Sequence, residues 1–171
     1  MWWPSARQAR ARPAAVILLA LALAGCGFRP LHQQGGGGDA AALRSIEVAP
    51  IPERLGQQLR NELDQRFVSA GQPAFRLEAG VRAQVSDLAI QKDESAIQSR
   101  VIVFASFVLK EAAGGREVTR GASRATVSYT RTPSQYANMV AEEDARRRAL
   151  REIADDIRSR VAVALAARQR G

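Results

Sequence analysis

The sequence predicts an α+β domain, a two-layer sandwich in which two helices pack on one face of an about four-stranded sheet. Two segments repeat apolar residues every three or four positions, as amphipathic helices do. Three segments between them alternate apolar and polar residues or are apolar throughout, as strands are. With one strand before the first helix, the predicted order is β-α-β-β-β-α in a mostly antiparallel or mixed sheet. Residues 43–171 are expected to form one domain around a single core.

Residues 1–25 have the pattern of a secretory signal peptide. The segment starts with three arginines and no acidic residue, and the apolar run after them, of about 10 residues, is too short to span a bilayer. It leads into Leu23-Ala24-Gly25-Cys26, which has the pattern of a bacterial lipobox. We therefore predict cleavage before Cys26 and a lipid anchor on its thiol, with several acyl chains such as palmitate. The alternative is cleavage near Ala24 by a general signal peptidase, which would leave Cys26 free.

Residues 26–42 are predicted to be a tether between the lipidated Cys26 and the domain. Four consecutive glycines, Gly35 to Gly38, cannot hold a unique conformation and indicate a flexible chain. The residue after Cys26 is Gly27 and not aspartate, which is the usual inner-membrane retention signal of enterobacterial lipoproteins, so we expect the outer membrane. His32, the only histidine, has no neighbouring partners for metal binding or general-base catalysis, and we interpret it as a surface residue.

The charge and the cysteine content limit the classes of partner. Removal of residues 1–25 takes away three arginines and no acid, so the mature chain has 22 basic and 17 acidic residues, a net charge of +5. In an exported lipoprotein this charge favours the phosphates of lipid headgroups and lipopolysaccharide over those of nucleic acid. Because Cys26 is the only cysteine, the chain cannot form an internal disulfide.

A short strand and an amphipathic helix are predicted at the start of the domain. Residues 43–49 contain the strand, and Pro52 suits the first turn of the helix. Gly71 and Pro73 are expected to end this helix. Its apolar residues recur at every fourth position, at Leu55, Leu59, Leu63 and Phe67. We expect this stripe to pack on the sheet.

The middle of the chain is predicted to fold into three consecutive strands. These strands are expected at residues 75–85, 97–110 and 118–131. The parity of the apolar residues changes after the first of them, which indicates a β-bulge at Ser86-Asp87. Polar residues at 91–95 predict a turn, and Ala112 to Gly115 predict a hairpin.

The predicted strand 97–110 is apolar on both faces. One face carries Val101, Val103, Phe107 and Leu109, and the other carries Ile102, Phe104 and Val108. The two helices are expected to cover only the first set. The second set is covered either by the curl of the sheet and its loops or by a partner or an acyl chain, and the sequence leaves both alternatives open.

A long second helix is predicted to begin at Thr132-Pro133-Ser134-Gln135. We expect Thr132 to cap it, Pro133 to take the first helical position and Gln135 to complete a capping box. Its apolar stripe, which is expected to face the core, contains Tyr136, Met139, Val140, Leu150, Ile153, Ile157, Val161 and Leu165. The mixed charges around the stripe are typical of a solvated helix face with ion pairs.

No pattern typical of an enzyme, a metal site or a cofactor site occurs in the sequence. There is no Gly-rich loop between a strand and a helix, no Gly-x-Ser-x-Gly motif, no metal-ligand cluster and no Cys-His or Ser-His pair with a third catalytic member. Carboxylates are concentrated on the two predicted helices, beside basic residues. We therefore expect no enzymatic activity, no metal and no cofactor.

The residues that follow the lipobox are more specific than the lipobox itself. They read Cys26-Gly27-Phe28-Arg29-Pro30-Leu31. Together with the order of the predicted elements over nearly the whole chain, they resemble the LptE family of lipopolysaccharide-assembly lipoproteins, of the alphaproteobacterial type. His32 departs from the tyrosine that is common in the family at this position. Within the domain, Thr132-Pro133 and Tyr136 before a long charged helix are the best local likeness.

The resemblance implies a non-enzymatic subunit of the lipopolysaccharide translocon of the outer membrane. Members of the family plug the large β-barrel protein LptD, assist its assembly and bind lipopolysaccharide for insertion at the cell surface. We therefore expect the chain to be anchored in the outer membrane through Cys26, with its domain on the periplasmic side within the barrel lumen. A basic domain on a lipid tether is compatible with the polar interior of a barrel.

Five basic residues are candidates for binding the phosphates of lipopolysaccharide. Arg116, Arg120 and Arg124 recur at a spacing of four, so an unbroken strand would place them on one face as a basic strip. Lys92 and Arg100 flank the preceding turn. Arginine binds phosphate oxygens with a forked pair of hydrogen bonds. The alternative is that these residues are ordinary solvated or cross-strand paired residues.

Two other functions remain open from the sequence. One is an auxiliary lipoprotein of an envelope lipid transport system of the ABC or Mla-like type, which would have the same anchor and a small α+β domain. The other is a lipoprotein regulator of a cell-wall synthase, although a tether of about a dozen residues is short for reaching an inner-membrane enzyme. Co-purification with a barrel protein would separate the translocon subunit from both.

Overall fold

The structure, a computed structural model, describes residues 42–69, 71–90 and 97–170 of the 171-residue chain. The predicted signal peptide, Cys26 with the tether up to residue 41, and the turn at 91–95 with Lys92 lie outside these residues. Within the described part, no helix is both long enough and apolar enough to cross a bilayer.

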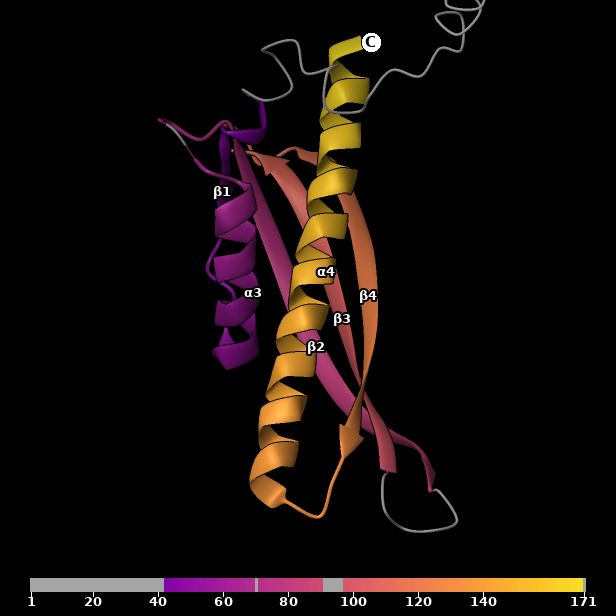
Figure 1. Cartoon of the computed structure of the whole chain (residues 1–171). Helices are drawn as coiled ribbons and strands as arrows, with labels where there is room; N and C mark the ends of the chain where they lie inside the picture. The colour runs from indigo at the N-terminus through magenta and orange to yellow at the C-terminus, as the bar shows by residue number, and fades with distance from the viewer. Residues whose placement is uncertain (1–41, 70, 91–96, 171) are drawn as a thin grey trace, which may run out of the picture. The chain divides into compact units, whose positions relative to one another are not determined.

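A four-stranded sheet and two helices make up the domain, and both helices lie on the same face of the sheet (Figure 1). The elements in chain order are β1 (Ile46–Val48), α3 (Glu53–Arg66), β2 (Phe75–Ile90), β3 (Ile97–Glu111), β4 (Glu117–Arg131) and α4 (Gln135–Arg170). The strands are adjacent in the order β1-β2-β3-β4. The predicted two-layer α+β sandwich and its order β-α-β-β-β-α are therefore confirmed.

The connections between the strands explain why the sheet is mixed. β1 pairs in parallel with the start of β2, with Ile46 opposite Phe75, because α3 returns the chain between them. β2, β3 and β4 then pair as antiparallel neighbours. In the turn between β3 and β4, Gly114 and Gly115 have φ angles of 90° and 67°, which glycine adopts without strain. The predicted hairpin at residues 112–115 is confirmed.

Two irregularities interrupt the alternation of the long strands. The register of β2 against β3 shifts between Asp87 and Ala89, so the predicted bulge is present. A second shift separates Leu109, which is opposite Thr119, from the next residue of β3, which is opposite Glu117. β4 therefore has one extra residue near its start, and side chains before and after it do not follow one alternating pattern.

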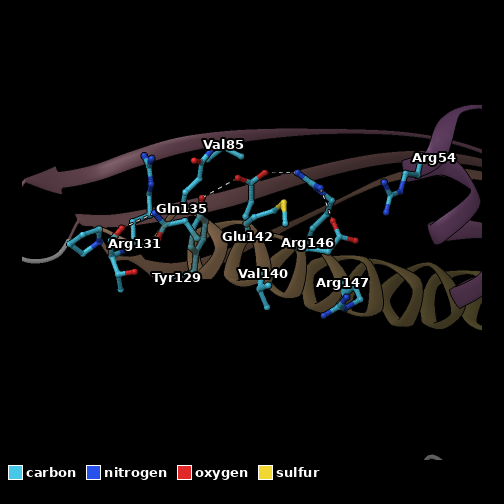
Figure 2. A pocket seen from close by; sticks show the side chains of 14 residues that line it. Arg54, Val85, Tyr129, Arg131, Gln135, Val140, Glu142, Arg146 and Arg147 are labelled. Carbon is cyan, nitrogen blue, oxygen red and sulfur yellow. Dashed lines mark hydrogen bonds and ion pairs between the residues drawn. The ribbon is translucent and has the colours of Figure 1, made fainter.

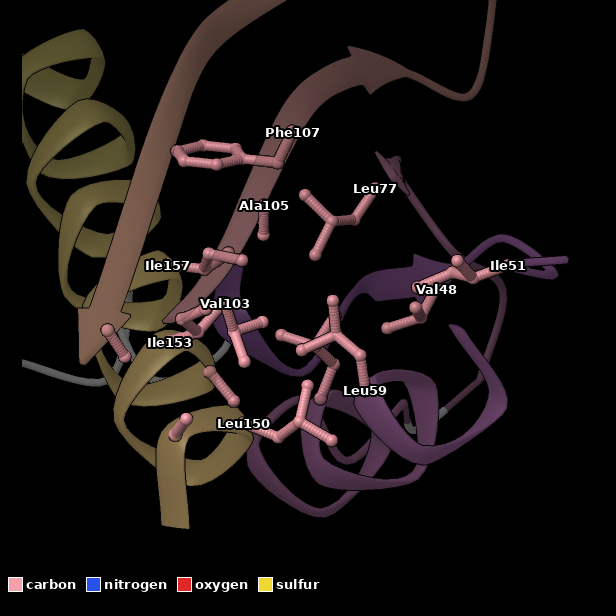
Figure 3. Close-up of a cluster of buried hydrophobic side chains, with 14 of the residues drawn as sticks. Val48, Ile51, Leu59, Leu77, Val103, Ala105, Phe107, Leu150, Ile153 and Ile157 are labelled. Carbon is pink, nitrogen blue, oxygen red and sulfur yellow. The ribbon is translucent and has the colours of Figure 1, made fainter. Parts of the chain in front are cut away.

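The core fills the layer between the helices and the sheet (Figure 3). α3 contributes Leu59 and Leu63, and α4 contributes Ile153 and Ile157, all four without exposed surface. The sheet contributes its inward residues, which include Leu77, Val101, Val103, Phe107 and Leu109. The predicted helical stripes and the first face of β3 therefore meet in one core.

Polar contacts join the two helices at the edge of this core. Arg66 of α3 places its Nε 2.6 Å from Oδ1 of Asp155 on α4, and the guanidinium holds the pKa of that carboxyl below its ordinary value. Gln58 Nε2 donates to Oε1 of Glu143 at 3.0 Å. Two separate points of α3 are thus attached to α4, which sets the position of one helix along the other.

The start of the last helix differs from the prediction. α4 begins at Gln135, and Ser134 rather than Thr132 caps it, since the Ala137 N–H donates to Ser134 Oγ at 3.4 Å. The backbone N–H and C=O of Thr132 instead pair with the side-chain amide of Asn138, with both hydrogen bonds at 2.7 Å. Short polar side chains compete for the same backbone groups, and the turn geometry decides which of them caps the helix.

The ends of the predicted apolar stripes also differ. α3 ends at Arg66, before Gly71, and the buried Phe67 is its C-cap. In the first turns of α4, three apolar residues expected in the core are exposed: Tyr136 at 74%, Met139 at 62% and Val140 at 46%. Because α3 has 14 residues and α4 has 36, α3 covers only part of the longer helix.

The second apolar face of β3 is covered by long side chains of the neighbouring strands. Phe104 lies opposite Arg82 of β2 and Arg124 of β4, whose guanidinium carbons are 5.0 and 5.2 Å from the ring centroid. Ile102 on the same face is only 3% exposed. Arginine stems shield apolar surface while their charged ends stay in water. The sequence left open whether this face is covered by the curl of the sheet and its loops or by a partner or an acyl chain. The arginines of the neighbouring strands are a further source of cover.

Gly121 of β4 leaves the space that the ring of Phe107 occupies. A Cβ atom at Gly121 would lie 2.8 Å from Cε1 and Cζ of the ring. We expect Gly121→Ala to lower the free energy of unfolding by about 1–3 kcal/mol, because the buried ring has to leave its packed position. Gly80→Ala is the matched control, since a Cβ there meets only Ser106 Oγ, at 3.6 Å. Chemical denaturation measures both variants, and equal stabilities would contradict this explanation.

Candidate functional site

A groove lies at the end of the domain where β4 leads into α4 (Figure 2). It has a volume of 970 Å³ and is bounded by the start of α3, the ends of β2 and β4, and the first turns of α4. Its lining includes one residue or more from each of these elements, such as Arg54 of α3, Val85 of β2, Tyr129 of β4 and Met139 of α4. The site, which we call the α4 groove, therefore brings together residues from four separate elements.

A set of ion pairs and hydrogen bonds forms the middle of the α4 groove. Arg146 donates to Glu142 and Glu143, at 2.6 and 2.9 Å. Tyr129 Oη lies 3.5 Å from Oε2 of Glu142. Burial raises the pKa of Tyr129 above its ordinary value, and the negative charge of Glu142 raises it further, so the phenol stays protonated at neutral pH. The charge of Arg146 is therefore already neutralised within the chain.

A second polar cluster holds the end of β4 against β2 and β3. Ser99 is fully buried, and its Oγ donates to Oδ1 of Asp87 at 2.6 Å. The same carboxylate oxygen lies 3.5 Å from Nη1 of Arg131. The β2–β3 pairing places Asp87 opposite Ser99, just before the bulge. The bulge region thus positions Arg131 at one end of the α4 groove, opposite Arg54 at the other end (Figure 2).

Three arginines of the α4 groove are available to a ligand. Arg54 forms no ion pair with the residues that the structure describes. Arg131 and Arg147 have carboxylate neighbours only at 3.5 and 3.7 Å. Exposed pairs of this kind contribute little free energy, so the guanidinium groups can exchange them for a stronger anion at small cost. The groove therefore offers three cations to a negatively charged ligand.

Apolar side chains stand exposed beside these arginines. Val85 is 45% exposed, and the outward residues Met139 and Val140 continue the apolar surface along α4. Tyr136 lies one turn before them on the same helix. Exposed apolar groups next to unpaired or weakly paired cations suit a ligand that has both anionic and apolar parts, because each part gains from a different contact.

The chemistry of the α4 groove is suited to binding. In residues 42–69, 71–90 and 97–170, no group of three His, Cys, Asp or Glu side chains is arranged to hold a metal ion. The carboxylates of Glu142 and Glu143 both accept hydrogen bonds from Arg146. Both carboxylates are therefore occupied by that arginine in the middle of the groove.

The structure divides the predicted strip of Arg116, Arg120 and Arg124. Arg116 precedes β4 and pairs with Glu111, at 2.8 Å, and Arg120 pairs with Glu117. Because β4 has an extra residue at its start, Arg116 is out of step with the other two. Arg120 and Arg124 do share one face of the sheet, opposite residues of β3. Lipopolysaccharide binding by the strip stays a prediction.

Arg100, the fourth described candidate, is placed apart from that strip. It lies on the same face of the sheet as Arg124, in register with Ser86 and Ser128. Its Nε is buried and has no hydrogen-bond partner among the described residues. Lys92 falls outside them. The four described candidates are therefore spread over the sheet instead of forming one site.

The sequence reasoning missed the α4 groove because its residues are far apart in the chain. Arg54, Arg131 and Arg147 come from three different segments, and no local pattern links them. One signal was present, since Tyr136 and Met139 begin an apolar stripe well before the first buried residue of α4, Ala145. A helix of 36 residues is about 54 Å long and one of 14 residues about 21 Å, so the shorter helix cannot cover the whole stripe.

Solved structures of two bacterial lipoproteins are similar to this domain. A lipoprotein from Caulobacter crescentus CB15 matches with a TM-score of 0.60 and 26% sequence identity, over 76% of this chain and 97% of that chain. The rare lipoprotein B from Shewanella oneidensis matches with a TM-score of 0.56 and 18% identity, over 73% of this chain and 97% of that chain. At this low identity, the second likeness shows that the fold is shared.

The sequence also matches a family model. The model, LptE, is described as lipopolysaccharide-assembly, and it matches residues 43–161, which include all the strands and most of α4. No curated protein matches the chain. Because the family model spans well over half of the sequence, this chain belongs to the LptE family of lipopolysaccharide-assembly lipoproteins.

Proposed function

We propose that the chain is the non-enzymatic lipoprotein subunit of the lipopolysaccharide translocon of the outer membrane. It is anchored through Cys26, sits in the lumen of the β-barrel partner LptD, assists assembly of that barrel and binds lipopolysaccharide for insertion at the cell surface. Membership of the LptE family supports the assembly role. The observation that carries the binding role is the α4 groove, where available arginines stand beside exposed apolar side chains.

Lipopolysaccharide matches both chemistries of the α4 groove. Its phosphate groups can accept forked hydrogen bonds from Arg54, Arg131 and Arg147. Its acyl chains can cover Met139 and Val140, and burial of apolar surface contributes roughly 25 cal/mol per Å². A ligand with only one of these parts would leave half of the groove unused.

The surface of the domain suits a polar barrel lumen. Most of the large apolar residues that the structure describes are gathered in the core, and several of the exposed ones line the α4 groove. α4 carries ion pairs on its exposed side, including Arg148 with Asp144 and Arg160 with Asp156, both at 2.9 Å. The interior of a transmembrane β-barrel is itself polar. A plug with such a surface can contact the lumen without desolvating large apolar areas.

An affinity pull-down of the mature lipoprotein from outer membranes in mild detergent tests this function. We expect a large β-barrel protein and lipopolysaccharide to be recovered together with it. The control is Cys26→Ala, which removes the lipid anchor, and this variant should no longer be found in the membrane fraction. Recovery of an envelope lipid transporter or a cell-wall synthase in place of a barrel would support one of the alternative functions. Recovery with no barrel partner at all would rule out the proposed role.

A further inference from the structure

The face of the sheet turned away from the helices, which we call the outer face, carries a stacked Arg-Phe-Arg row. Arg82 of β2, Phe104 of β3 and Arg124 of β4 are opposite one another in the strand register. Their guanidinium carbons lie 5.0 and 5.2 Å from the ring centroid, which is within cation–π distance. A guanidinium that stacks on a ring has already lost conformational freedom before a partner binds. Its N–H donors stay available for a forked pair of hydrogen bonds to a carboxylate.

Small residues beside this row leave a shallow trough. The next row across the same three strands consists of Gly80, Ser106 and Ala122. Together with the stacked row they enclose a hollow of 470 Å³. The trough exists because none of the three side chains is larger than a serine, and it runs across the strands directly beside both arginines.

The cations of the outer face differ in whether they already have a partner. The paired cations are Lys110, whose Nζ lies 2.6 Å from Glu78 Oε2, and Arg120, which is paired with Glu117. The other cations of this face form no ion pair with any residue in the part of the chain that the structure describes: they are Arg76 and Arg100, and the two that stack on Phe104, Arg82 and Arg124. Both are exposed, so their charge is open to a partner.

We propose that the outer face is a protein-docking surface, in which Arg82 and Arg124 bind carboxylates of the barrel partner while an apolar side chain of that partner fills the trough. The inference rests on the proposed function, because it names the surface through which the domain contacts the barrel. Arginine and aromatic residues are enriched at the energetic centres of protein interfaces, and paired rim charges contribute less. Arg82, Phe104 and Arg124 form such a centre, and the paired cations Lys110 and Arg120 lie toward one end of the strands.

The charge of the outer face favours an acidic partner, and the shape of its trough favours a protein over a lipid. Glu47, Glu78 and Glu117 lie on this same face, at the end where β1 pairs with β2. Because Glu78 and Glu117 are already paired with Lys110 and Arg120, the other arginines of this face give it an excess of positive charge, which suits acidic residues of a partner. The trough is also shallow and sits on a continuous sheet, so it offers no depth for acyl chains.

A double substitution in the full-length lipoprotein, Arg82→Gln with Arg124→Gln, tests the docking surface. Affinity purification in mild detergent, followed by washes of increasing salt, measures how much barrel partner is retained. We expect about tenfold less retained barrel than for the wild type, from a domain that still unfolds in one cooperative thermal transition. Arg158→Gln with Arg160→Gln on α4 removes the same charge from exposed helix positions and should retain the barrel.

The outcomes separate this inference from the proposed function. If the wild type recovers no barrel, the proposed function fails. If the wild type and the Arg82/Arg124 double variant recover the barrel equally at every salt concentration, only the docking surface is overturned. Loss of lipopolysaccharide with the barrel retained would show an anionic-lipid site and would overturn the docking surface as well.

A photo-crosslinking residue at Ala122 gives a test that does not depend on removing the arginines. Ala122 is exposed in the trough, so a crosslinker there should react with the barrel partner. The same residue at Ser159, exposed on α4, is the comparison position. Absence of a crosslink from position 122 in a complex that contains the barrel would overturn the docking surface.

Discussion

The Ile153→Ala variant is expected to lose about 2–5 kcal/mol of its free energy of unfolding. Ile153 has no exposed surface and lies between α4 and the sheet (Figure 3). Truncation to alanine removes three buried carbon atoms. It leaves a cavity between α4 and the sheet that these elements cannot fully close. Equilibrium denaturation by urea, followed by circular dichroism, measures the loss for the soluble domain without its lipid anchor.

Val163→Ala is the matched control on the same helix. Val163 is 65% exposed, so its truncation should change the free energy of unfolding by less than about 0.5 kcal/mol. Both variants remove methyl groups from a β-branched residue of α4, and they differ in burial. A loss in Val163→Ala as large as in Ile153→Ala would show that this part of α4 does not pack as the structure has it.

Charge reversal in the α4 groove, Arg54→Glu with Arg147→Glu, is expected to lower lipopolysaccharide retention by about tenfold or more. The change replaces two cations with two anions at the site proposed for phosphate groups, so attraction becomes repulsion. Quantification of lipopolysaccharide per purified lipoprotein measures the effect. Thermal unfolding should be nearly unchanged, because neither arginine makes a close ion pair with the described residues.

The strip predicted from the sequence provides the comparison for this result. Arg120→Ala with Arg124→Ala removes two cations from the outer face and should leave lipopolysaccharide retention unchanged if the α4 groove is the binding site. Loss of retention in the strip variant, together with normal retention in the Arg54/Arg147 variant, would assign lipopolysaccharide to the strip and reject the groove. The two variants thus test two surfaces of one molecule against each other.

The predictions that held depended on neighbours close in sequence. The alternation after Phe75 and the helical spacing of Leu59 and Leu63 predicted strand and helix, because each secondary structure repeats with its own period. The glycines at 114 and 115 predicted the hairpin for a similar reason, since the turn needs positive φ angles. Such signals are local, and the fold did not change them.

The predictions that failed depended on partners far away in sequence. Helical spacing assigned Tyr136 and Met139 to the core, but spacing does not show how far the neighbouring helix extends. The spacing of four would place all three arginines of the strip on one face of an unbroken strand, and the extra residue in β4 moved Arg116 out of step, while lipopolysaccharide binding by the strip stays a prediction. Periodicity reports the face on which a residue lies and not what covers that face.

Composition, periodicity and the residues after Cys26 were thus enough to predict the α+β sandwich, its element order and the LptE family. The two surfaces proposed for binding came only from the tertiary structure. The packing of elements places Arg54 and Arg147 in the lining of one groove, and the register of the strands places Arg82 and Arg124 on the ring of Phe104. These contacts join residues separated by long stretches of chain, and a one-residue shift in register would move every side chain of a strand to the opposite face.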